Sequence, residues 1–455
     1  MPTIISVLRT RLGGDTMLGK GAAMALARGI NILSGFLLAV VLARVLGANG
    51  YGTYLFALAI AQMLAMPSMM GLPALLMRQI AIYASEERYE LINGIVRWGL
   101  KLVLMATFVV SLGFGAFVLS RSITNGRPTS LELYVWIVPF VLATGLMSWA
   151  SAILHGFQRP FWASLPDGTI RPLLLLGAVA ALAGLGQLNP VSAMGLHVAA
   201  TTMAFVWAAI MVWRYCDLGG EVHLGTRAAS DHRAWFSSLW PLFLTVAAAT
   251  INSKLDLVML GALRPSGDVA LYGLAVQLAA LVVVPQTILN TIIAPRIAAA
   301  GARNDKDELQ KTISSACLLS FIGALAAIVL LVLFGRQMVS LFFGAEFAAT
   351  YDVLIVLSVG QLIISSMAPA IISLNMLHDE KRVAGMVVAS GGVNIVLNIL
   401  LIPTFGIMGA AVATIITNAG LQMICAIVLY RRHRLIAWAF LSRILPRTNE
   451  QERVV

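Results

Sequence analysis

The sequence predicts an all-α, polytopic membrane protein with twelve transmembrane helices in two six-helix lobes. Of its 455 residues, 59% are hydrophobic and only 11% are charged, whereas soluble proteins average about 25% charged residues. Apolar stretches recur along the whole chain, and each approaches the length of about 20 residues that crosses a hydrocarbon core. The two halves of the sequence also resemble each other. A transmembrane barrel would instead show alternating segments of about ten residues.

The chain begins with a basic segment, residues 1–20, that we expect at the cytoplasmic membrane surface. Twelve predicted spans follow. They cover residues 21–45, 52–77, 98–120, 133–154, 171–188, 193–213, 238–263, 269–295, 313–335, 352–377, 383–403 and 406–430. The domains predicted from them are an amino-terminal lobe at 21–214, a cytoplasmic linker at 215–235, a carboxy-terminal lobe at 236–430 and a basic cytoplasmic tail at 431–455.

Lysine and arginine are distributed unequally between the two sides of the membrane. An even number of spans places both termini on one side. With the amino terminus in the cytoplasm, the cytoplasmic segments hold 24 Lys and Arg residues and the outer segments hold five. This excess predicts cytoplasmic termini by the positive-inside rule. It also explains the net charge of +11 without nucleic acid.

An internal repeat relates the two lobes. A shift of 218 residues aligns several identical residues of the first half with the second, among them the pairs Tyr54 and Tyr272, Pro67 and Pro285, and Arg78 and Arg296. The shift covers six spans and therefore keeps chain direction, which predicts lobes related by an axis along the membrane normal. Such repeats place a transport pathway between the lobes near mid-membrane.

The repeated prolines and arginines are candidate gating residues. Pro67 and Pro285 lie in corresponding spans, and each removes a backbone hydrogen bond and favours a kink. The alternative is that membrane helices tolerate proline without a functional consequence. Arg78 and Arg296 end these spans on the inner side. Their alternative interpretation is that of simple positive-inside anchors.

Three ionisable residues lie deep in apolar runs: Arg28, Lys254 and Asp256. Each costs about 2.5–3.5 kcal/mol at a helix centre, so such residues are usually functional and face a bundle interior or cavity. Lys254 and Asp256 are two residues apart and therefore point to different sides of the helix. We expect Lys254 to face the pathway and Asp256 to have a structural or coupling role inside its own lobe.

Arg28 and Lys254 are the candidate substrate-binding cations, and the helical spacing adds two polar neighbours, Asn31 and Asn252, to this set. Asn31 shares a face with Arg28, and Asn252 shares a face with Asp256. Two alternatives stay open. Arg28 lies close enough to the inner interface to extend its charge there, and Lys254 and Asp256 could both be buried and compensated by other residues.

No pattern in the sequence predicts an enzyme, a metal site or a cofactor. The stretch from Gly14 to Lys20 has the spacing of a phosphate-binding loop, but Gly21 replaces the expected Ser or Thr and no strand precedes it. The six histidines do not cluster with cysteines or carboxylates at metal-ligand spacing. The three cysteines form no disulfide framework.

Three stretches resemble a known family. They are Leu42–Gly47 running into Gly50–Gly52, Lys254–Gly261, and Asn394–Asn398 continuing through Pro403, Gly406, Gly409 and Ala410. In their order and with twelve spans, they are similar to polysaccharide flippases (Wzx type) of the MOP superfamily, which also includes MATE exporters and lipid II flippases. The resemblance implies a MATE-like fold with two bundles around a central cavity. The chain lacks the two extra carboxy-terminal spans expected of lipid II flippases.

The resemblance also implies a function: translocation of undecaprenyl-pyrophosphate-linked oligosaccharide repeat units across the bacterial inner membrane. Because no ATP-binding motif is found, we expect an ion gradient or downstream polymerisation to drive it. Its expected partners are the lipid-linked oligosaccharide, membrane lipids, and the polysaccharide polymerase with its chain-length machinery. Nucleic acid is not an expected partner. The alternatives are a MATE-like exporter of small cations and a non-transporting scaffold for glycan assembly. A cationic pathway disfavours cationic substrates by Coulomb repulsion, and a scaffold would not need a buried lysine.

Overall fold

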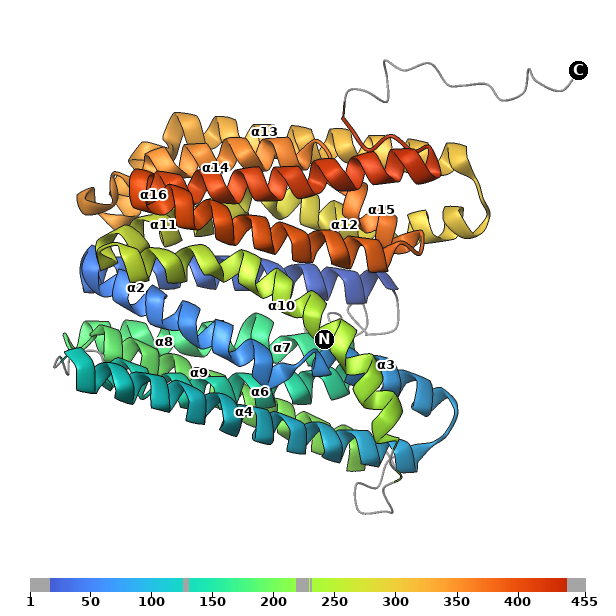
Figure 1. Ribbon diagram of the computed structural model, residues 1–455, viewed down its shortest axis with the longest axis horizontal. Coiled ribbons are helices and arrows are strands. Elements are labelled where there is room, and N and C mark those ends of the chain that lie inside the picture. Colours follow the sequence, from blue (N-terminus) through green and yellow to red (C-terminus); the bar gives the residue numbers. More distant parts are fainter. Residues whose placement is uncertain (1–16, 126–130, 218–228, 230, 440–455) are drawn as a thin grey trace, which may run out of the picture. The chain divides into compact units, whose positions relative to one another are not determined.

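All regular elements in the described part of the chain are helices (Figure 1). The computed structural model describes residues 17–125, 131–217, 229 and 231–439. The all-helical class predicted from the sequence is therefore confirmed. Residues 1–16 of the predicted surface segment, most of the predicted linker and residues 440–455 of the tail lie outside the described residues.

The helices have the length and apolarity of membrane spans. Among the described residues, nine helices could cross a membrane, or up to ten if a bent pair at residues 350–376 counts as one span. Large apolar side chains on these helices are exposed, for example Phe108 (68% exposed) and Leu112 (65%). Hydrocarbon tails are an apolar solvent for such side chains, so the chain is a multi-pass membrane protein.

The chain divides into two compact units, Met1–Thr250 and Ile251–Val455, called unit 1 and unit 2 below. The labels follow Figure 1. Unit 1 contains α2 (Met17–Met69), α3 (Leu72–Ser85), α4 (Tyr89–Asn125), α5 (Leu131–Tyr134), α6 (Ile137–Gly156), α7 (Pro160–Leu165), the π-helical turn η2 (Pro166–Ile170), α8 (Arg171–Gly184) and α9 (Pro190–Asp217). Helix α10 (His232–Leu263) begins in unit 1 and ends in unit 2.

The core of unit 1 is formed by α3, α4, α6 and α9 together with the first turns of α10. Trp235 of α10 is fully buried in it, and its indole N–H donates a hydrogen bond to the hydroxyl of Tyr83 (2.9 Å). The buried indole thus has its polar group satisfied, as buried tryptophans require. This contact fixes the start of α10 in unit 1.

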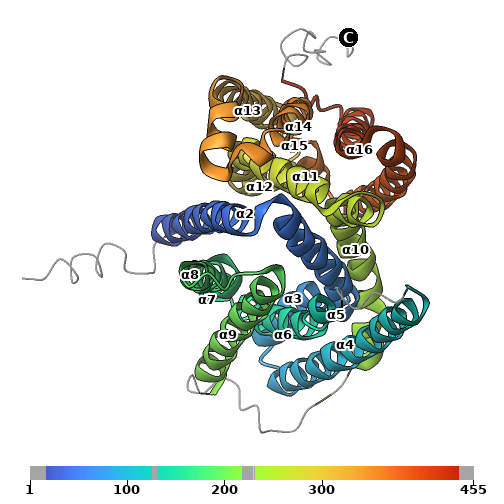
Figure 2. The same ribbon diagram turned by 90° about the vertical axis from the view of Figure 1, so that its left-hand side faces the viewer.

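Unit 2 contains α11 (Ser266–Ala279), the 3-10 turn η3 (Ala280–Val283), α12 (Val284–Ala302), α13 (Lys306–Phe343), the 3-10 turn η4 (Ala345–Phe347), α14 (Thr350–Ser365), α15 (Pro369–Met376) and α16 (Glu380–His433). Helices α13, α14 and α16 run side by side, and the view along the bundle separates them (Figure 2). Gly360 of α14 allows close packing, because a Cβ atom there would lie 2.4 Å from Ile415.

The chain continues beyond α16 into the core of unit 2. Leu435, Ala437 and Ala439 are each only 2% exposed and belong to the same apolar cluster as α12, α13 and α15. The side-chain amide of Gln310 binds the backbone of Ile436 twice, donating to its carbonyl (2.9 Å) and accepting from its N–H (2.8 Å). Residues 435–439 are therefore an ordered part of unit 2.

Two glycines interrupt the longest helices. Gly47 of α2 and Gly406 of α16 have non-helical backbone angles with φ of +66° and +59°, a region that glycine adopts without a steric penalty. Next to Gly406, Arg264 donates hydrogen bonds to the carbonyls of Ile402 (3.2 Å) and Pro403 (3.1 Å). These contacts satisfy carbonyl groups at the end of a helical segment and place a positive charge there, where the helix dipole favours it.

Candidate functional site

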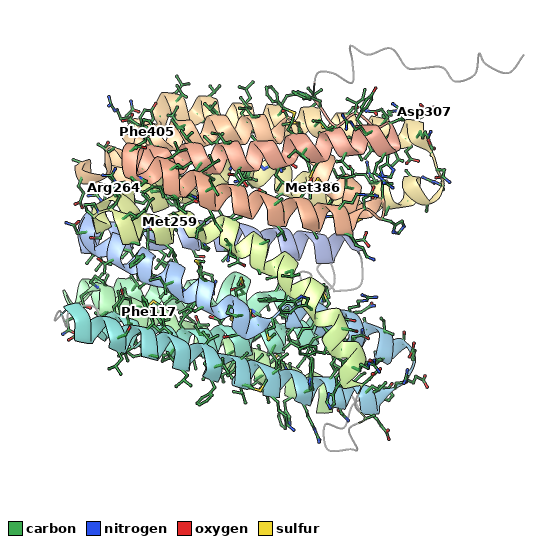
Figure 3. All side chains as sticks on the ribbon, in the orientation of Figure 1. Phe117, Met259, Arg264, Asp307, Met386 and Phe405 are labelled. Carbon is green, nitrogen blue, oxygen red and sulfur yellow. The ribbon has the colours of Figure 1, made fainter. Side chains whose placement is uncertain are left out.

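The intramembrane charges of α10 lie in regular helix and have different surroundings. Asp256 is 4% exposed, whereas Lys254 is half-buried. Met259, which is labelled in Figure 3, lies three residues beyond Asp256 on the same helix. Because the helix is continuous from residue 252 to residue 256, the side chains of Lys254 and Asp256 leave it in different directions.

The carboxylate of Asp256 is the centre of a polar cluster within unit 2. Its Oδ1 accepts a hydrogen bond from the Nδ2 of Asn398 (2.6 Å). Its Oδ2 accepts hydrogen bonds from the hydroxyls of Tyr272 (2.8 Å) and Thr414 (2.5 Å). A buried carboxylate is tolerable only when hydrogen bonds replace its lost hydration, and these three donors come from α11 and from both halves of α16.

A row of polar residues on α16 positions this cluster. Ser390, Asn394 and Asn398 recur every four residues, share one face of the helix and are all buried. Asn398 also donates to the Oδ1 of Asn394 (3.0 Å), and Asn252 of α10 donates to the hydroxyl of Ser390 (3.3 Å). Helix α10 therefore contacts this row through two residues, Asn252 and Asp256, which lie about one turn apart on α10.

Lys254 has no such support. Within the described part of the chain, its ammonium group makes neither an ion pair nor a hydrogen bond. A half-buried cation without a protein partner can bind an anionic group at little further desolvation cost. The predicted role of Lys254 as a substrate-binding cation stays a prediction.

In unit 1, the predicted residues lie on α2. The backbone of Arg28 is helical, and its side chain lies outside the described residues. Asn31 is half-buried, and its backbone carbonyl accepts a hydrogen bond from the Ser34 hydroxyl (3.1 Å). Neither observation tests the predicted binding role of this pair.

The candidate gating residues lie next to irregular backbone. Pro67 precedes the end of α2 at Met69, after which Met70 and Gly71 have positive φ angles. Pro285 is the second residue of α12 and follows the 3-10 turn η3. Arg78 and Arg296 are both exposed. The gating roles of these four residues stay predictions.

Several partners in these clusters were not singled out as site residues from the sequence. Tyr272, Thr414 and Asn398 complete the Asp256 cluster, and in unit 1 the hydroxyl of Tyr54 contacts the Nδ1 of buried His197 (2.7 Å). The repeat offered a signal, because Tyr54 and Tyr272 are repeat-related and both contact a buried ionisable group. The spacing of Asn394 and Asn398 was a second signal.

Comparisons with known proteins identify the family. The family described as polysaccharide biosynthesis protein matches residues 18–301, and the family described as MatE matches residues 241–404. A probable low-salt glycan biosynthesis flippase, Agl15 of Haloferax volcanii, is 29% identical over 168 residues, which cover 37% of this chain and 35% of that protein. A probable flippase of the same organism, AglR, is 27% identical over 167 residues. This chain thus aligns with about a third of the length of these relatives.

Solved structures share the fold at low sequence identity. An inward-facing MATE multidrug transporter of the MOP superfamily superposes with a TM-score of 0.76 and 14% identity, over 89% of this chain and 95% of that one. The lipid II flippase MurJ, in an inward closed conformation, gives 0.69 and 15%, over 89% and 87%. Both proteins are described as a transporter or a flippase. The sequence predicted a transporter and not an enzyme. The fold and the family match agree with the resemblance drawn from the sequence, and the chain belongs to the family described as polysaccharide biosynthesis protein.

Proposed function

We propose that this protein flips undecaprenyl-pyrophosphate-linked oligosaccharide repeat units across the bacterial inner membrane for surface polysaccharide export. The observation that carries the proposal is the contrast on α10: Asp256 is fully hydrogen-bonded within unit 2, whereas Lys254 has no partner among the described residues. An unpaired pyrophosphate cannot enter hydrocarbon because burying its charge costs many kcal/mol. Lys254, together with Arg28, offsets that charge in a central cavity reached alternately from each side.

A twelve-span, two-lobe arrangement underlies this proposal. If α14 and α15 form one span, and if α2 and α16 are divided at Gly47 and Gly406, the nine candidate helices become twelve spans. The repeat supports the same division. Helix α4 (Tyr89–Asn125) and helix α13 (Lys306–Phe343) begin 217 residues apart, close to the shift of 218 found in the sequence. We propose the same lobe bounds as the sequence predicted, 21–214 and 236–430.

The neighbours of the two cations have supporting roles. Asn31 lies one turn from Arg28 and provides a polar contact close to the pyrophosphate. Asn252 donates to Ser390 and so holds α10 in the orientation that turns Lys254 toward the substrate. Pro67 and Pro285 allow their helices to bend during alternating access, with Arg78 and Arg296 at the inner ends. The polymerase and the chain-length machinery receive the product on the outer side.

Deletion and complementation test the proposal. The deletion strain should lose surface polysaccharide and accumulate lipid-linked repeat units, and the wild-type gene should restore both. Arg28→Ala and Lys254→Ala should each reduce surface glycan strongly at normal membrane levels. Arginine forms a planar fork suited to phosphate whereas lysine acts as a point charge, so Arg28→Lys should be impaired and Lys254→Arg should keep more activity.

Lys311→Ala is the matched control, because Lys311 is exposed in the first turns of α13. It should restore surface glycan fully. Full restoration by both Arg28→Ala and Lys254→Ala would reject the cationic-cavity mechanism. Normal surface glycan in the deletion strain, together with sensitivity to cationic drugs, would replace a glycan flippase by a MATE-like exporter.

A further inference from the structure

A cavity at one end of unit 1 lies apart from the intramembrane charges. It has a volume of about 650 Å³, within the range of about 300–1,000 Å³ typical of ligand pockets. Its walls come from α2, from the segment around α5 and from the start of α9. The lining residues used below are Thr53, Glu132, Tyr134, Trp136 and Asn189.

The polar groups of this cavity include both acceptors and donors that are not engaged elsewhere in the described chain. The Glu132 carboxylate makes no ion pair or hydrogen bond there, and neither does the indole N–H of Trp136. The Oδ1 of Asn189 accepts from the Ser192 backbone (2.8 Å), which leaves its amide N–H groups as donors. The Thr53 hydroxyl donates to the carbonyl of Asn49 (2.8 Å) and can still accept.

The aromatic rings of the cavity are held in place by packing. The Trp136 ring lies against Gly195 of α9, where a Cβ atom would come within 3.2 Å of the indole. Tyr134 packs edge-to-face against Phe114, with ring centroids 5.9 Å apart and planes at 89°. Rings fixed in this way present apolar surface to a ligand at little entropic cost.

We propose that this outer cavity of unit 1 binds sugar residues of the transported glycan. A sugar presents an apolar C–H face, which suits aromatic rings, and hydroxyl groups that both donate and accept hydrogen bonds. An organic cation would need only the aromatic rings and the carboxylate. It would make no use of the indole N–H of Trp136 or the amide N–H groups of Asn189. The mixture of donors and acceptors therefore favours a neutral polyhydroxyl ligand. This inference rests on the proposed function, which places these residues on the side where the glycan is delivered.

Binding is measured on the purified protein in lipid nanodiscs by saturation-transfer difference NMR. The probe is the oligosaccharide released by mild acid from the lipid-linked pool of the deletion strain. Wild-type protein should transfer saturation to it. Glu132→Gln keeps the side-chain shape and removes the negative charge, and Trp136→Phe keeps an aromatic ring but removes the indole N–H donor. Each should weaken binding about fivefold, the effect of one hydrogen bond.

Two substitutions serve as matched controls. Trp213→Phe alters an exposed tryptophan in the last turns of α9, and Glu380→Gln alters an exposed carboxylate at the start of α16. Both should bind the oligosaccharide like wild type. Absence of transfer to wild-type protein, or unchanged binding by both cavity variants, would overturn the sugar site. So would tetraphenylphosphonium binding that depends on Glu132 while the oligosaccharide gives none.

The flippase proposal and the sugar site fail in different experiments. A deletion strain with normal surface glycan and no accumulated repeat units would reject the flippase. The binding measurement uses no translocation, so its failure with a correct deletion phenotype would reject the sugar site alone.

Discussion

At the scale of single residues, two ionisable side chains of α10, Asp256 and Lys254, differ in burial and in hydrogen bonding. Asp256 accepts three hydrogen bonds from residues 16 to 158 positions away in the chain. The sequence predicted that Asp256 and Lys254 leave the helix on different sides, because that follows from helical geometry. The repeat and the helical spacing marked Tyr272 and Asn398 as candidate polar residues, but not as donors to Asp256, because long-range side-chain contacts depend on how the helices pack.

Replacing Asp256 by Asn should mainly lower the amount of folded protein. The variant keeps one acceptor oxygen but turns an NH₂ group toward hydroxyl and amide donors, and a lost hydrogen bond to a charged group costs about 1.5–3 kcal/mol. Membrane level and the thermal midpoint, followed by fluorescence-detected gel filtration, should both fall. Lys254→Ala, two residues earlier on the helix, should leave both unchanged. A stable Asp256→Asn protein that fails to restore surface glycan would instead assign the carboxylate to coupling.

A second buried carboxylate, Asp379, lies in the turn between α15 and α16 and is 5% exposed. It accepts a hydrogen bond from Arg382, and it contacts Arg432 (3.2 Å) and His433 (2.8 Å) at the far end of α16. Burial by itself raises the pKa of Asp379, but the contacts with His433, Arg382 and Arg432 outweigh it and lower the pKa below the ordinary value of 3.8.

This lowered pKa predicts a pH dependence of stability. A depressed pKa in the folded state stabilises the protein at pH values above the unfolded value of 3.8, and that stabilisation is lost as pH falls through the folded pKa. We expect Asp379→Asn to lower the thermal midpoint at pH 7, with a smaller difference from wild type at pH 3. An equal difference at both pH values would show that charge is not the cause. Asp307→Asn, at an exposed position, provides the control.

At the scale of elements, helix type was predictable, whereas helix continuity was predictable only in part. The predicted span ends at 45 and 403 lie within three residues of the breaks at Gly47 and Gly406. The break between α14 and α15, which bends a predicted single span by 40°, comes just before Pro369, a helix-start signal that the span prediction did not use. In an apolar solvent, a helix can be interrupted only where local contacts satisfy the freed backbone groups. These contacts come from other parts of the chain, so the hydrophobic periodicity of the interrupted segment does not reveal them.

Gly406 provides a test of this argument. Its backbone angles (φ +59°, ψ −132°) are strained for any residue with a Cβ atom, and that atom would also lie 3.3 Å from the Arg264 guanidinium. Gly406→Ala should cost about 1–3 kcal/mol and should lower the thermal midpoint. Gly392→Ala, in regular helix of α16 with open space around it, should stabilise by up to about 1 kcal/mol. Equal effects of the two substitutions would contradict a special backbone at Gly406.

At the scale of the whole molecule, composition and charge predicted more than local pattern did. The scarcity of charge and the recurrence of apolar runs gave the membrane class, and the resemblance gave the family. Repeat symmetry predicted lobes at 21–214 and 236–430, and these bounds stay a prediction. The two compact units of the structure meet at Thr250, which lies inside α10. The sequence could not identify this boundary, because an uninterrupted helix contains no local feature that marks a change of packing partner.

The orientation in the membrane is the prediction that involves the whole chain. Labelled side chains place Arg264 and Asp307 at opposite ends of unit 2 (Figure 3). The excess of Lys and Arg predicts that the end with Asp307 lies in the cytoplasm. Single cysteines replacing exposed Gln187, Glu346 or Asp307 are introduced into a chain in which Cys216 has been replaced by alanine. The other two cysteines, Cys317 and Cys425, are buried.

A membrane-impermeant maleimide is then added to right-side-out vesicles. Residues 187 and 346 should react at once, because both lie in turns on the outer side of the predicted topology. Residue 307 should react only after the vesicles are opened with detergent. Immediate labelling of residue 307 with protection of the other two would invert the orientation. Labelling of residues 187 and 346 from opposite sides would contradict the even shift of six spans and, with it, the parallel repeat.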